Sequence, residues 1–415
     1  MEASVRERDV VRSLAARVAE IAALPVQAEK AELWRRLNRL DPVRPMVMLQ
    51  MPNDAPWRET GIAEMMECGE PFHRRQELML RRLIYQWEHQ PADMVVDDVI
   101  HVPVVIRDTG FGVARKREEP DHWFGAARFL PTIESEEEIE KIQTPQVSVD
   151  WEETERAYQQ HGELYDGILR VQKTGRGGFW FSMFDEFIQW RGLDQAFLDM
   201  VDRPEWLHRL LERMTQGHLA EIEALEREGA LALNNGNVRV GSQGLGFTDE
   251  LPRPDFDNRR VRIADLWGHA ATQIFVDVSP AMHEEFALQY EARLLARFGL
   301  GSYGCCEPLH RKVDIVKKHV PNLRIISMSP WVDVEVGAAA VGKDLVFAYK
   351  PNPAIMAGDT WDLDVVRADL RRAFEKTRGC AVAVLLKDLH TCNGHPTRMW
   401  EWTRAAVELA EEFAA

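Results

Sequence analysis

The sequence predicts an α/β protein that folds as a (β/α)8 barrel of the TIM type. Short apolar runs, many of them β-branched, alternate along the chain with longer amphipathic segments, which is typical of parallel strands joined by helices. Eight such runs spread over about 370 residues favour a closed barrel, in which functional residues lie at the carboxyl ends of the strands. The predicted strands are residues 46–51, 93–98, 167–172, 230–233, 299–305, 323–328, 345–349 and 381–386.

A helical segment is predicted to precede the barrel, so that residues 1–40 form one unit and residues 41–415 the barrel. Apolar residues recur at helical spacing from Val11 to Ile21, and the pattern ends at Asp41 and Pro42. Two long intervals, residues 99–166 and 234–274, are predicted as loops inserted at the rim of the barrel. The first carries a charged run that suits a solvated helix face, and the second could be a lid over the barrel mouth or a plain surface loop.

The composition excludes several classes of partner. The net charge is −16 and no block of Lys and Arg interrupts it, so sequence-independent binding to nucleic acid is not expected. No run approaches the roughly 18 apolar residues that a membrane-spanning helix needs, and the N-terminus is charged, so we expect a cytoplasmic protein. Five cysteines, an odd number in 415 residues, indicate reduced thiols rather than a disulfide framework.

Two strand ends carry most of the candidate chemistry. Residues 301–310 place Cys305, Cys306 and Glu307 after one strand, and residues 387–395 place His390 and Cys392 after another. Thiolates and imidazoles on one rim predict a zinc-type metal site or a reactive thiol site. Because side chains alternate along a strand, Tyr303 and Cys305 are expected on one face, with Cys305 pointing inward. Glu307 is a candidate ligand, acid or base, or helix cap.

Further polar and aromatic residues follow other predicted strands. Asp97 and Asp98 form a carboxylate pair that could share a proton or bind substrate, or could simply cap and face solvent. An aromatic cluster after residues 177–178 could wall an apolar substrate pocket or fill the core. The candidates for substrate contact are His101, Trp180, Asn234, Tyr303, Tyr349 and Asn352, and the candidates for catalysis are Asp98 and Glu307.

The order of these motifs resembles the uroporphyrinogen decarboxylase superfamily, which also contains corrinoid-dependent methyltransferases. The resemblance covers residues 30 to 415 and implies a (β/α)8 barrel with N-terminal helices and an active-site funnel at the strand ends. The motifs that carry it are residues 30–45, Ala92–Asp98, Val278–Pro280, Tyr303–Cys305 and Lys350–Pro353.

Departures from the family pattern favour the methyltransferase branch. The decarboxylases carry carboxylate-binding arginines after the first strand, and residues 49–57 of this chain lack arginine. The zinc-dependent methyltransferases use a His-x-Cys motif after the fifth strand and a second Cys after the eighth. Here the first motif is Tyr303-Gly304-Cys305 and the second Cys is Cys392, so the resemblance implies that Cys306, Glu307 or His390 completes a zinc site.

The expected function is therefore a corrinoid-dependent methyltransferase. It would demethylate a small methylated substrate, for which a methoxylated aromatic is one candidate, and pass the methyl group to a corrinoid, or cobalamin, cofactor on a partner protein. The alternative is a metal-free decarboxylase that acts on a smaller substrate through Asp98. A non-enzymatic corrinoid-binding protein is a third possibility, because a fold alone does not fix a function. A homodimer is left open.

Overall fold

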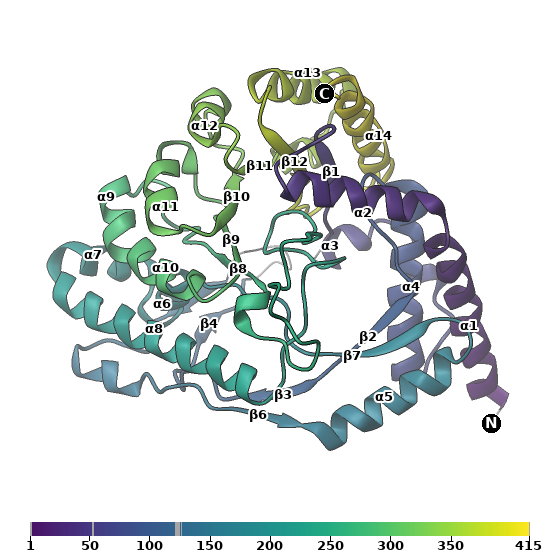
Figure 1. Cartoon of the computed structure of the whole chain (residues 1–415), viewed down its shortest axis with the longest axis horizontal. Coiled ribbons are helices and arrows are strands. Elements are labelled where there is room, and N and C mark those ends of the chain that lie inside the picture. The colour runs from purple at the N-terminus through teal and green to yellow at the C-terminus, as the bar shows by residue number, and fades with distance from the viewer. Residues whose placement is uncertain (1, 52–53, 121–124, 126, 415) are drawn as a thin grey trace.

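The central element of the protein is a six-stranded parallel sheet. It is seen in a computed structural model that describes residues 2–51, 54–120, 125 and 127–414 (Figure 1). The strand order is β1-β12-β11-β10-β9-β8, so the first strand of the chain pairs with the last. These strands are β1 (Met46–Leu49), β8 (Trp267–Ala270), β9 (Leu300–Tyr303), β10 (Leu323–Met328), β11 (Val346–Tyr349) and β12 (Ala381–Leu386).

The other strands form short pairs outside this sheet. The parallel pair β2–β7 and two isolated bridges extend the six-stranded sheet into an incomplete ring of strands. After β7, Arg176 bridges Leu231, and Phe181 bridges Ala270 of β8. The arrangement is TIM-barrel-like, but among the described residues the ladders do not close into a barrel. The short pairs are made of β2 (Val99–Pro103) with β7 (Arg170–Thr174), β3 (Val105–Asp108) with β6 (Val147–Asp150), and β4 (Lys116–Glu118) with β5 (Arg128–Leu130).

Two predicted strands are wrong, and six strands of the described residues, β2 to β6 and β8, lie in intervals predicted as loops. Residues 93–98 are irregular because side chains satisfy part of their backbone: Val96 N–H donates to Gln27 and the carbonyl of Asp93 accepts from Trp34. The strand predicted at 230–233 contributes only the single bridge at Leu231. Strand β8 lies inside the interval predicted as a loop. The intervals 323–328 and 381–386 are strands with the predicted bounds.

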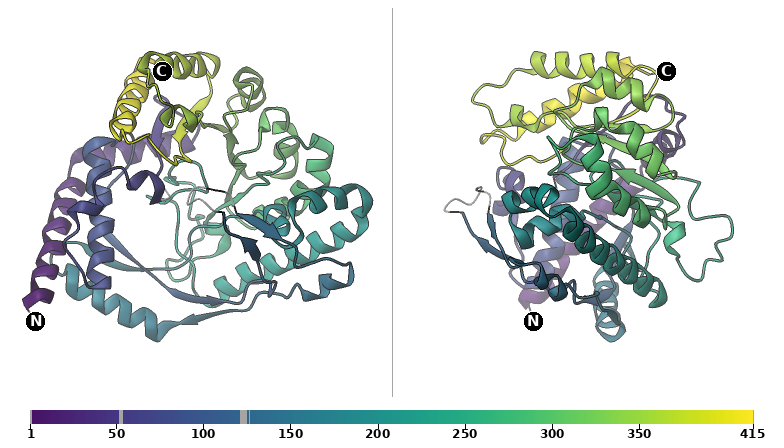
Figure 2. Two further views of the ribbon diagram at one scale, coloured as in Figure 1. Left: turned by 180° about the vertical axis from the view of Figure 1, so that it is seen from behind. Right: turned by 90° about the vertical axis from the view of Figure 1, so that its left-hand side faces the viewer.

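Helices cover the outside of the ring, as Figure 2 shows from two further sides. The N-terminal segment consists of two helices, of which α1 packs against α4 and α2 against β1 and β12. Helices α13 and α14 pack against each other beside β1 and β12. The α-helices before β7 are α1 (Glu2–Ala22), α2 (Pro25–Asn38), α3 (Asp54–Trp57), α4 (Pro71–His89) and α5 (Trp151–Tyr165). Those after it are α6 (Met183–Arg191), α7 (Leu193–Asp202), α8 (Pro204–Arg227), α9 (Pro280–His283), α10 (Gln289–Leu295), α11 (Val313–His319), α12 (Val334–Val341), α13 (Leu363–Lys376) and α14 (Thr397–Glu412).

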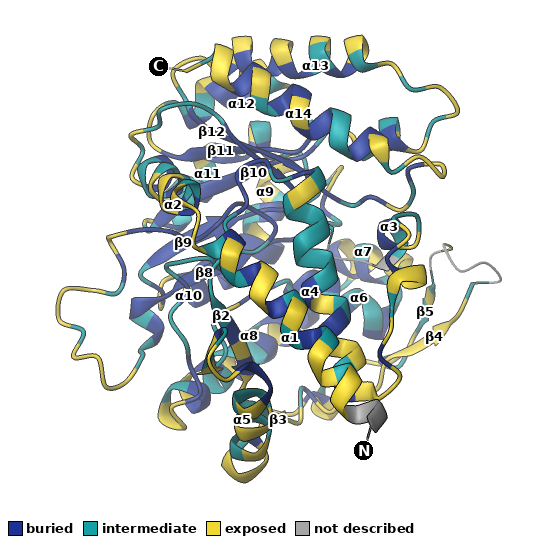
Figure 3. Ribbon diagram, turned by 90° about the vertical axis from the view of Figure 1, so that its right-hand side faces the viewer, coloured by how far each residue is buried: buried dark blue, intermediate teal, exposed yellow. Residues whose placement is uncertain are grey.

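The strands of the six-stranded sheet are buried on both faces, and Figure 3 shows them as a dark layer between exposed helices. One face packs against the outer helices. The other face packs against Trp34 of α2 and against Leu245 and Phe247. Residues 242–248 are all buried, so this part of the interval 234–274 is neither a lid nor a surface loop. It lies within the ring of strands because its apolar side chains complete the inner core (Figure 1).

The interval 99–166 is also more structured than predicted. It contains β2, the exposed β4, and α5, and its charged run ends in a 3-10 helix, Glu137–Lys141, that has no buried residue. The charged run is therefore a solvated helix, as expected. Residues 52–53, within the segment that lacks the arginines of the decarboxylases, lie outside the described residues. In the described part of the chain, no helix combines the length and apolar character needed to cross a membrane.

A buried ion pair fixes the start of the sheet. Arg44 donates to both carboxylate oxygens of Asp93 at 2.9 and 2.7 Å, and the same carboxylate accepts from Val47 N–H at 2.7 Å. Replacing Asp93 by alanine would leave a largely buried guanidinium without its partner. We expect Asp93→Ala to lower the free energy of unfolding by about 3–5 kcal/mol in urea denaturation.

The matched control is Glu152→Ala, which breaks an exposed pair between Glu152 and Arg156 on one face of α5. We expect that variant to unfold at the same urea concentration as the wild type, because exposed ion pairs contribute little to stability. An Asp93→Ala protein that is as stable as Glu152→Ala would show that the buried pair does not anchor β1.

Candidate functional site

Cys305 reaches the interior of the ring because the chain turns sharply at Gly304. Gly304 has φ +91°, and a Cβ at this position would lie 2.3 Å from Leu309 Cδ1, so only glycine fits. This left-handed residue ends the strand alternation of β9. Tyr303 therefore points toward α9 and α10, while the thiol of Cys305 points toward the ends of β11 and β12. The expectation that Tyr303 and Cys305 share a face is wrong for this reason.

Two buried lysines follow the adjacent strands and surround Cys305. Lys387, after β12, donates to Cys305 Sγ at 3.4 Å and pairs with Asp388 at 2.6 Å. Lys350, after β11, donates to the Cys305 carbonyl at 3.0 Å and to Ser242 Oγ at 2.6 Å. Burial lowers the pKa of Lys350 to about 8, against the opposing charge of Cys305. Two ammonium groups thus lie beside one thiol.

The two adjacent thiols share a proton. Cys305 Sγ lies 3.5 Å from Cys306 Sγ, and Cys306 Sγ lies 3.4 Å from Gln273 Oε1. The hydrogen bond from Cys306, aided by Lys350 and Lys387, lowers the pKa of Cys305 to about 5, although burial opposes this shift. The pKa of Cys306 is raised in turn. These contacts therefore favour a thiolate at Cys305 and a thiol at Cys306.

Glu307 supports the site from behind rather than facing it. Its carboxylate accepts from Cys305 N–H at 2.9 Å and from Thr272 N–H at 3.2 Å, and the side chain is fully buried. Burial raises the pKa of Glu307. These contacts support a role for Glu307 in fixing the backbone of Cys305. Among the described contacts, none joins the Glu307 carboxylate to a thiol, so its predicted role as an acid or base has no support.

Tyr303 belongs to a buried hydrogen-bonded chain behind Cys305. Its hydroxyl donates to Glu291 at 2.6 Å and lies 2.7 Å from His283 Nε2, while Lys312 Nζ lies 3.1 Å from His283 Nδ1. Burial raises the pKa of Glu291 to about 8. A π-helical turn, Glu284–Leu288, precedes α10 and precedes Glu291 in the chain. The predicted role of Tyr303 in substrate contact has no support in this packing.

The inner segment Gly241–Gln243 connects the parts of the site. A Cβ on Gly241 would lie 2.4 Å from the ring of His269, so the backbone packs directly on that imidazole. Ser242 accepts from Lys350. Gln243 donates to the carbonyl of Gly304 at 3.0 Å and is fully buried. Three consecutive residues therefore contact the ends of β8, β9 and β11.

Asp98 and His101 lie on the separate β2–β7 pair. Asp98 is half-exposed and accepts a bidentate contact from Arg170, with the shortest distance 2.6 Å. The hydrogen bond from Arg170 lowers the pKa of Asp98. His101 is exposed and its Nδ1 lies 2.8 Å from Thr174 Oγ1. An ionised, ion-paired carboxylate is poorly suited to proton transfer, so these contacts give the decarboxylase alternative no support.

The other predicted substrate contacts are scattered. Asn234 is buried and uses its amide to join segments, donating to Gly177 O at 2.6 Å and to Trp267 O at 3.0 Å. Tyr349 packs in the outer core, and Asn352 caps the 3-10 helix Pro353–Met356. Trp180 is 41% exposed and its ring lies against His269, with 4.4 Å between the ring centroids. Among these four residues, Trp180 is thus the one that contacts His269.

The side chains around Cys305 do not fit a zinc ion. A zinc thiolate would need further ligands in place of the Lys387 ammonium that contacts Cys305. Cys392 is buried in the outer core, where burial and Glu59 raise its pKa to about 12, and His390 is exposed. Within the described residues, the ligand atoms of Cys305, Cys306, His390 and Cys392 do not form a cluster of three. The described residues around Cys305 therefore form no zinc site.

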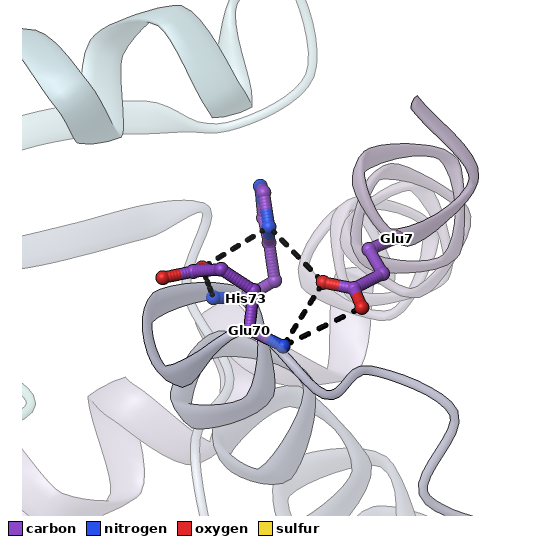
Figure 4. Close-up of side chains that lie close together, drawn as sticks. All are labelled: Glu7, Glu70 and His73. Carbon is purple, nitrogen blue, oxygen red and sulfur yellow. Dashed lines mark hydrogen bonds and ion pairs between the residues drawn. The ribbon is translucent and has the colours of Figure 1, made fainter. Parts of the chain in front are cut away.

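One group of potential ligand atoms does cluster, at the start of α4. Atoms of Glu7, Glu70 and His73 lie within 4.8 Å of one another (Figure 4). The carboxylates already accept backbone N–H groups: Glu7 from Gly69 at 2.9 Å and Glu70 from His73 at 2.9 Å. The group caps α4 and ties it to α1, which explains its geometry without a metal ion.

The residues missed from the sequence are Lys350, Lys387 and His269, together with the inner segment Gly241–Gln243. Both lysines directly follow predicted strands, so their position was a usable signal. His269 was missed because β8 was predicted as part of a loop. Its signal is the short run Trp267–Ala270, which alternates poorly and carries a glycine.

Comparisons with known proteins leave the family open. No protein-family profile matches the sequence, and the comparison with curated proteins found no match. Among solved structures, a methyltransferase from Methanosarcina mazei is similar, with a TM-score of 0.47 and 11% sequence identity, over 92% of this chain and 98% of that chain. A similarity this low says nothing about the activity of the present chain.

The charge environment of Cys305 makes a direct prediction for its reactivity. Alkylation by iodoacetamide requires the thiolate, so a lowered pKa means that the rate at Cys305 is already maximal at pH 7 and falls only near pH 5. Lys387→Met removes a positive charge that favours the thiolate. We expect the fall in rate to move to higher pH in that variant, measured by peptide mass spectrometry across pH.

Cys380→Ser serves as the control, because burial raises the pKa of Cys380 and its thiol contacts the carbonyl of Ala338 instead of a lysine. We expect the alkylation profile of Cys305 to be unchanged in it. If the wild-type rate at Cys305 rises only above pH 8, as for an ordinary cysteine, the thiolate assignment is wrong.

Proposed function

We propose that the protein is a methyltransferase that uses the Cys305 thiolate as its nucleophile. The observation that carries the proposal is the contact of Cys305 Sγ with Lys387 Nζ at 3.4 Å, within a buried site that also contains Lys350. A buried thiolate beside ammonium groups is the arrangement by which proteins activate a cysteine at neutral pH. Residues 303–305 resemble the His-x-Cys motif of the methyltransferase branch, which supports methyl as the group that is transferred.

In the proposed reaction the Cys305 thiolate attacks the methyl carbon of a small methylated substrate. The S–CH3 bond forms as the bond from the methyl carbon to the leaving atom breaks, and the electron pair departs with that atom. Methylation removes the negative charge of the thiolate, so the buried Lys350 and Lys387 lose their counter-charge. One of them then gives a proton to the leaving atom, which balances the step.

The methyl acceptor in this proposal is a corrinoid carried by a partner protein, as the family resemblance implies. When bound, a corrinoid supplies a low-valent cobalt centre that takes a methyl group. The contribution of this chain is to hold the thiol, to exclude water and to restore the thiolate between cycles. A methoxylated aromatic is the first substrate to test, because the exposed Trp180 offers an apolar surface at the site.

The proposal predicts that a methyl group moves onto Cys305. We expect 2-methoxyphenol with a deuterated methyl group to label wild-type protein at Cys305, detected by peptide mass spectrometry. A panel of methoxylated aromatics, methylamines and methylcobalamin extends the test to other donors. Cys305→Ser should lower labelling at least about a thousandfold, because it removes the nucleophile.

Cys392→Ser is the informative control. Its thiol packs in the outer core and its N–H, rather than its sulfur, contacts Glu59. We expect labelling of Cys305 to persist in this variant, whereas a zinc site shared by the two cysteines would lose it. Wild-type protein that reacts with iodoacetamide at Cys305 and takes no methyl group from any donor in the panel would contradict the proposed function.

A further inference from the structure

His269 is a buried histidine whose second ring nitrogen has no partner among the residues that the structure describes. It lies in β8 at register with Ser302 of β9, is 1% exposed, and its Nδ1 lies 2.7 Å from Ser302 Oγ. Its Nε2 is buried and contacts no hydrogen-bonding group among the described residues. Buried polar atoms are rarely left in this state, so an orphaned nitrogen at a reactive site indicates a ligand position.

The imidazole is held rigidly. The backbone of Gly241 packs on its ring, where any larger residue would collide. The indole of Trp180 lies edge-on to it at 4.4 Å between centroids, is 41% exposed, and donates its N–H to Ser182 at 3.1 Å. The indole is therefore the partly exposed group that packs on the buried His269 ring.

The inner segment Gly241–Gln243 links His269 to the backbone beside Cys305. Gly241 belongs to the inner segment in which Ser242 contacts Lys350 and Gln243 contacts the carbonyl of Gly304, directly before Cys305. Gln243 Oε1 is a second buried atom with no partner among the described residues. Its Nε2 donates to backbone carbonyl oxygens, so the free group is an acceptor. His269 Nε2 and Gln243 Oε1 are thus two buried polar atoms, without a partner among the described residues, on side chains linked to the Cys305 site.

The protonation of His269 suits hydrogen bonding rather than charge pairing. Burial, together with Lys350 and Lys387, lowers its pKa to about 3, so the ring is neutral at physiological pH. A neutral imidazole donates from one nitrogen and accepts at the other. When Ser302 donates its hydroxyl to Nδ1, Nε2 carries the proton and is the free donor.

We propose that His269 is a substrate-binding residue that donates its Nε2–H to the oxygen atom from which the methyl group leaves. The substrates are then methyl ethers rather than methyl thioethers, because sulfur is a weak acceptor and would leave Nε2 unsatisfied. As the C–O bond breaks, the electron pair stays on that oxygen, where the Nε2–H bond stabilises the developing charge before a buried lysine supplies the proton. This inference rests on the proposed function for the identity of the reaction, but the binding contact can be tested without turnover.

The test measures binding of catechol, the demethylated product of 2-methoxyphenol, under anaerobic conditions. Bound catechol should protect Cys305 from iodoacetamide, and the concentration for half-protection gives its affinity. We expect His269→Leu to weaken protection at least tenfold and His269→Gln, which keeps an N–H donor, to restore part of it. The pH profile of Cys305 alkylation without catechol should be the same in all three proteins, which controls for a merely structural effect.

Each outcome decides the inference. Equal protection in wild type and His269→Leu, within twofold, would overturn it, as would the absence of protection in wild type. If His269→Leu does not fold, His269→Gln is compared with the wild type. Protection weakened between twofold and tenfold supports a donor at this position, and protection unchanged within twofold overturns it. Consumption of 2-(methylthio)phenol as fast as 2-methoxyphenol overturns the choice of oxygen. Protein that binds catechol through His269 but transfers no methyl group would refute the proposed function alone.

Discussion

The arrangement of the site depends on one charge balance: the Cys305 thiolate against the ammonium groups of Lys387 and Lys350. These lysines follow β12 and β11, and Cys305 follows β9, so the balance joins three strand ends. A buried ammonium without an anion costs several kcal/mol. The fold therefore favours the ionised form of Cys305, and the same requirement makes the lysines proton donors once the sulfur is methylated.

The backbone makes this balance possible. Gly304 allows the chain to leave β9 in a left-handed turn, which directs Cys305 into the ring and Tyr303 toward the helices. Glu307 then fixes the new direction through two backbone N–H groups. The inner segment Gly241–Gln243 fills the remaining space, and its lack of side-chain bulk at Gly241 admits the His269 ring. The expected reactivity of Cys305 thus depends both on the turn at Gly304, which directs its thiol inward, and on the neighbouring lysines.

Sequence patterns predicted those parts of the fold that depend on local burial. The run at 381–386 is a continuous apolar strand that is buried throughout, the run at 323–328 is buried except at Arg324, and both strands have the predicted bounds. Residues 94–96 are also apolar, but side chains of α2 satisfy part of the backbone of residues 93–98, which no local pattern reveals. Strand β8 carries a glycine and a histidine, and its inward contacts come from a segment that composition alone assigns to a loop.

The part of the site that is local in sequence was predicted, and the part that depends on contacts between distant segments was not. Cys305, Cys306 and Glu307 are neighbours in sequence and remain neighbours in space. The convergence of Cys305 with Cys392 required the relative placement of two distant turns, and the buried, Glu59-bound position of Cys392 differs from the one expected. Lys350 stands in a motif that carries the family resemblance and Lys387 follows a predicted strand, but their role becomes apparent only when their distances to Cys305 are known.

The central claim is that ammonium groups and a neighbouring thiol, rather than a metal ion, hold the Cys305 thiolate. The measurement that tests it most directly is the zinc content of protein purified without chelators or metal-affinity columns, compared with Cys305→Ser and Cys392→Ser. The account predicts the same substoichiometric zinc in all three proteins. Near-stoichiometric zinc in the wild type that is lost in both variants would contradict it.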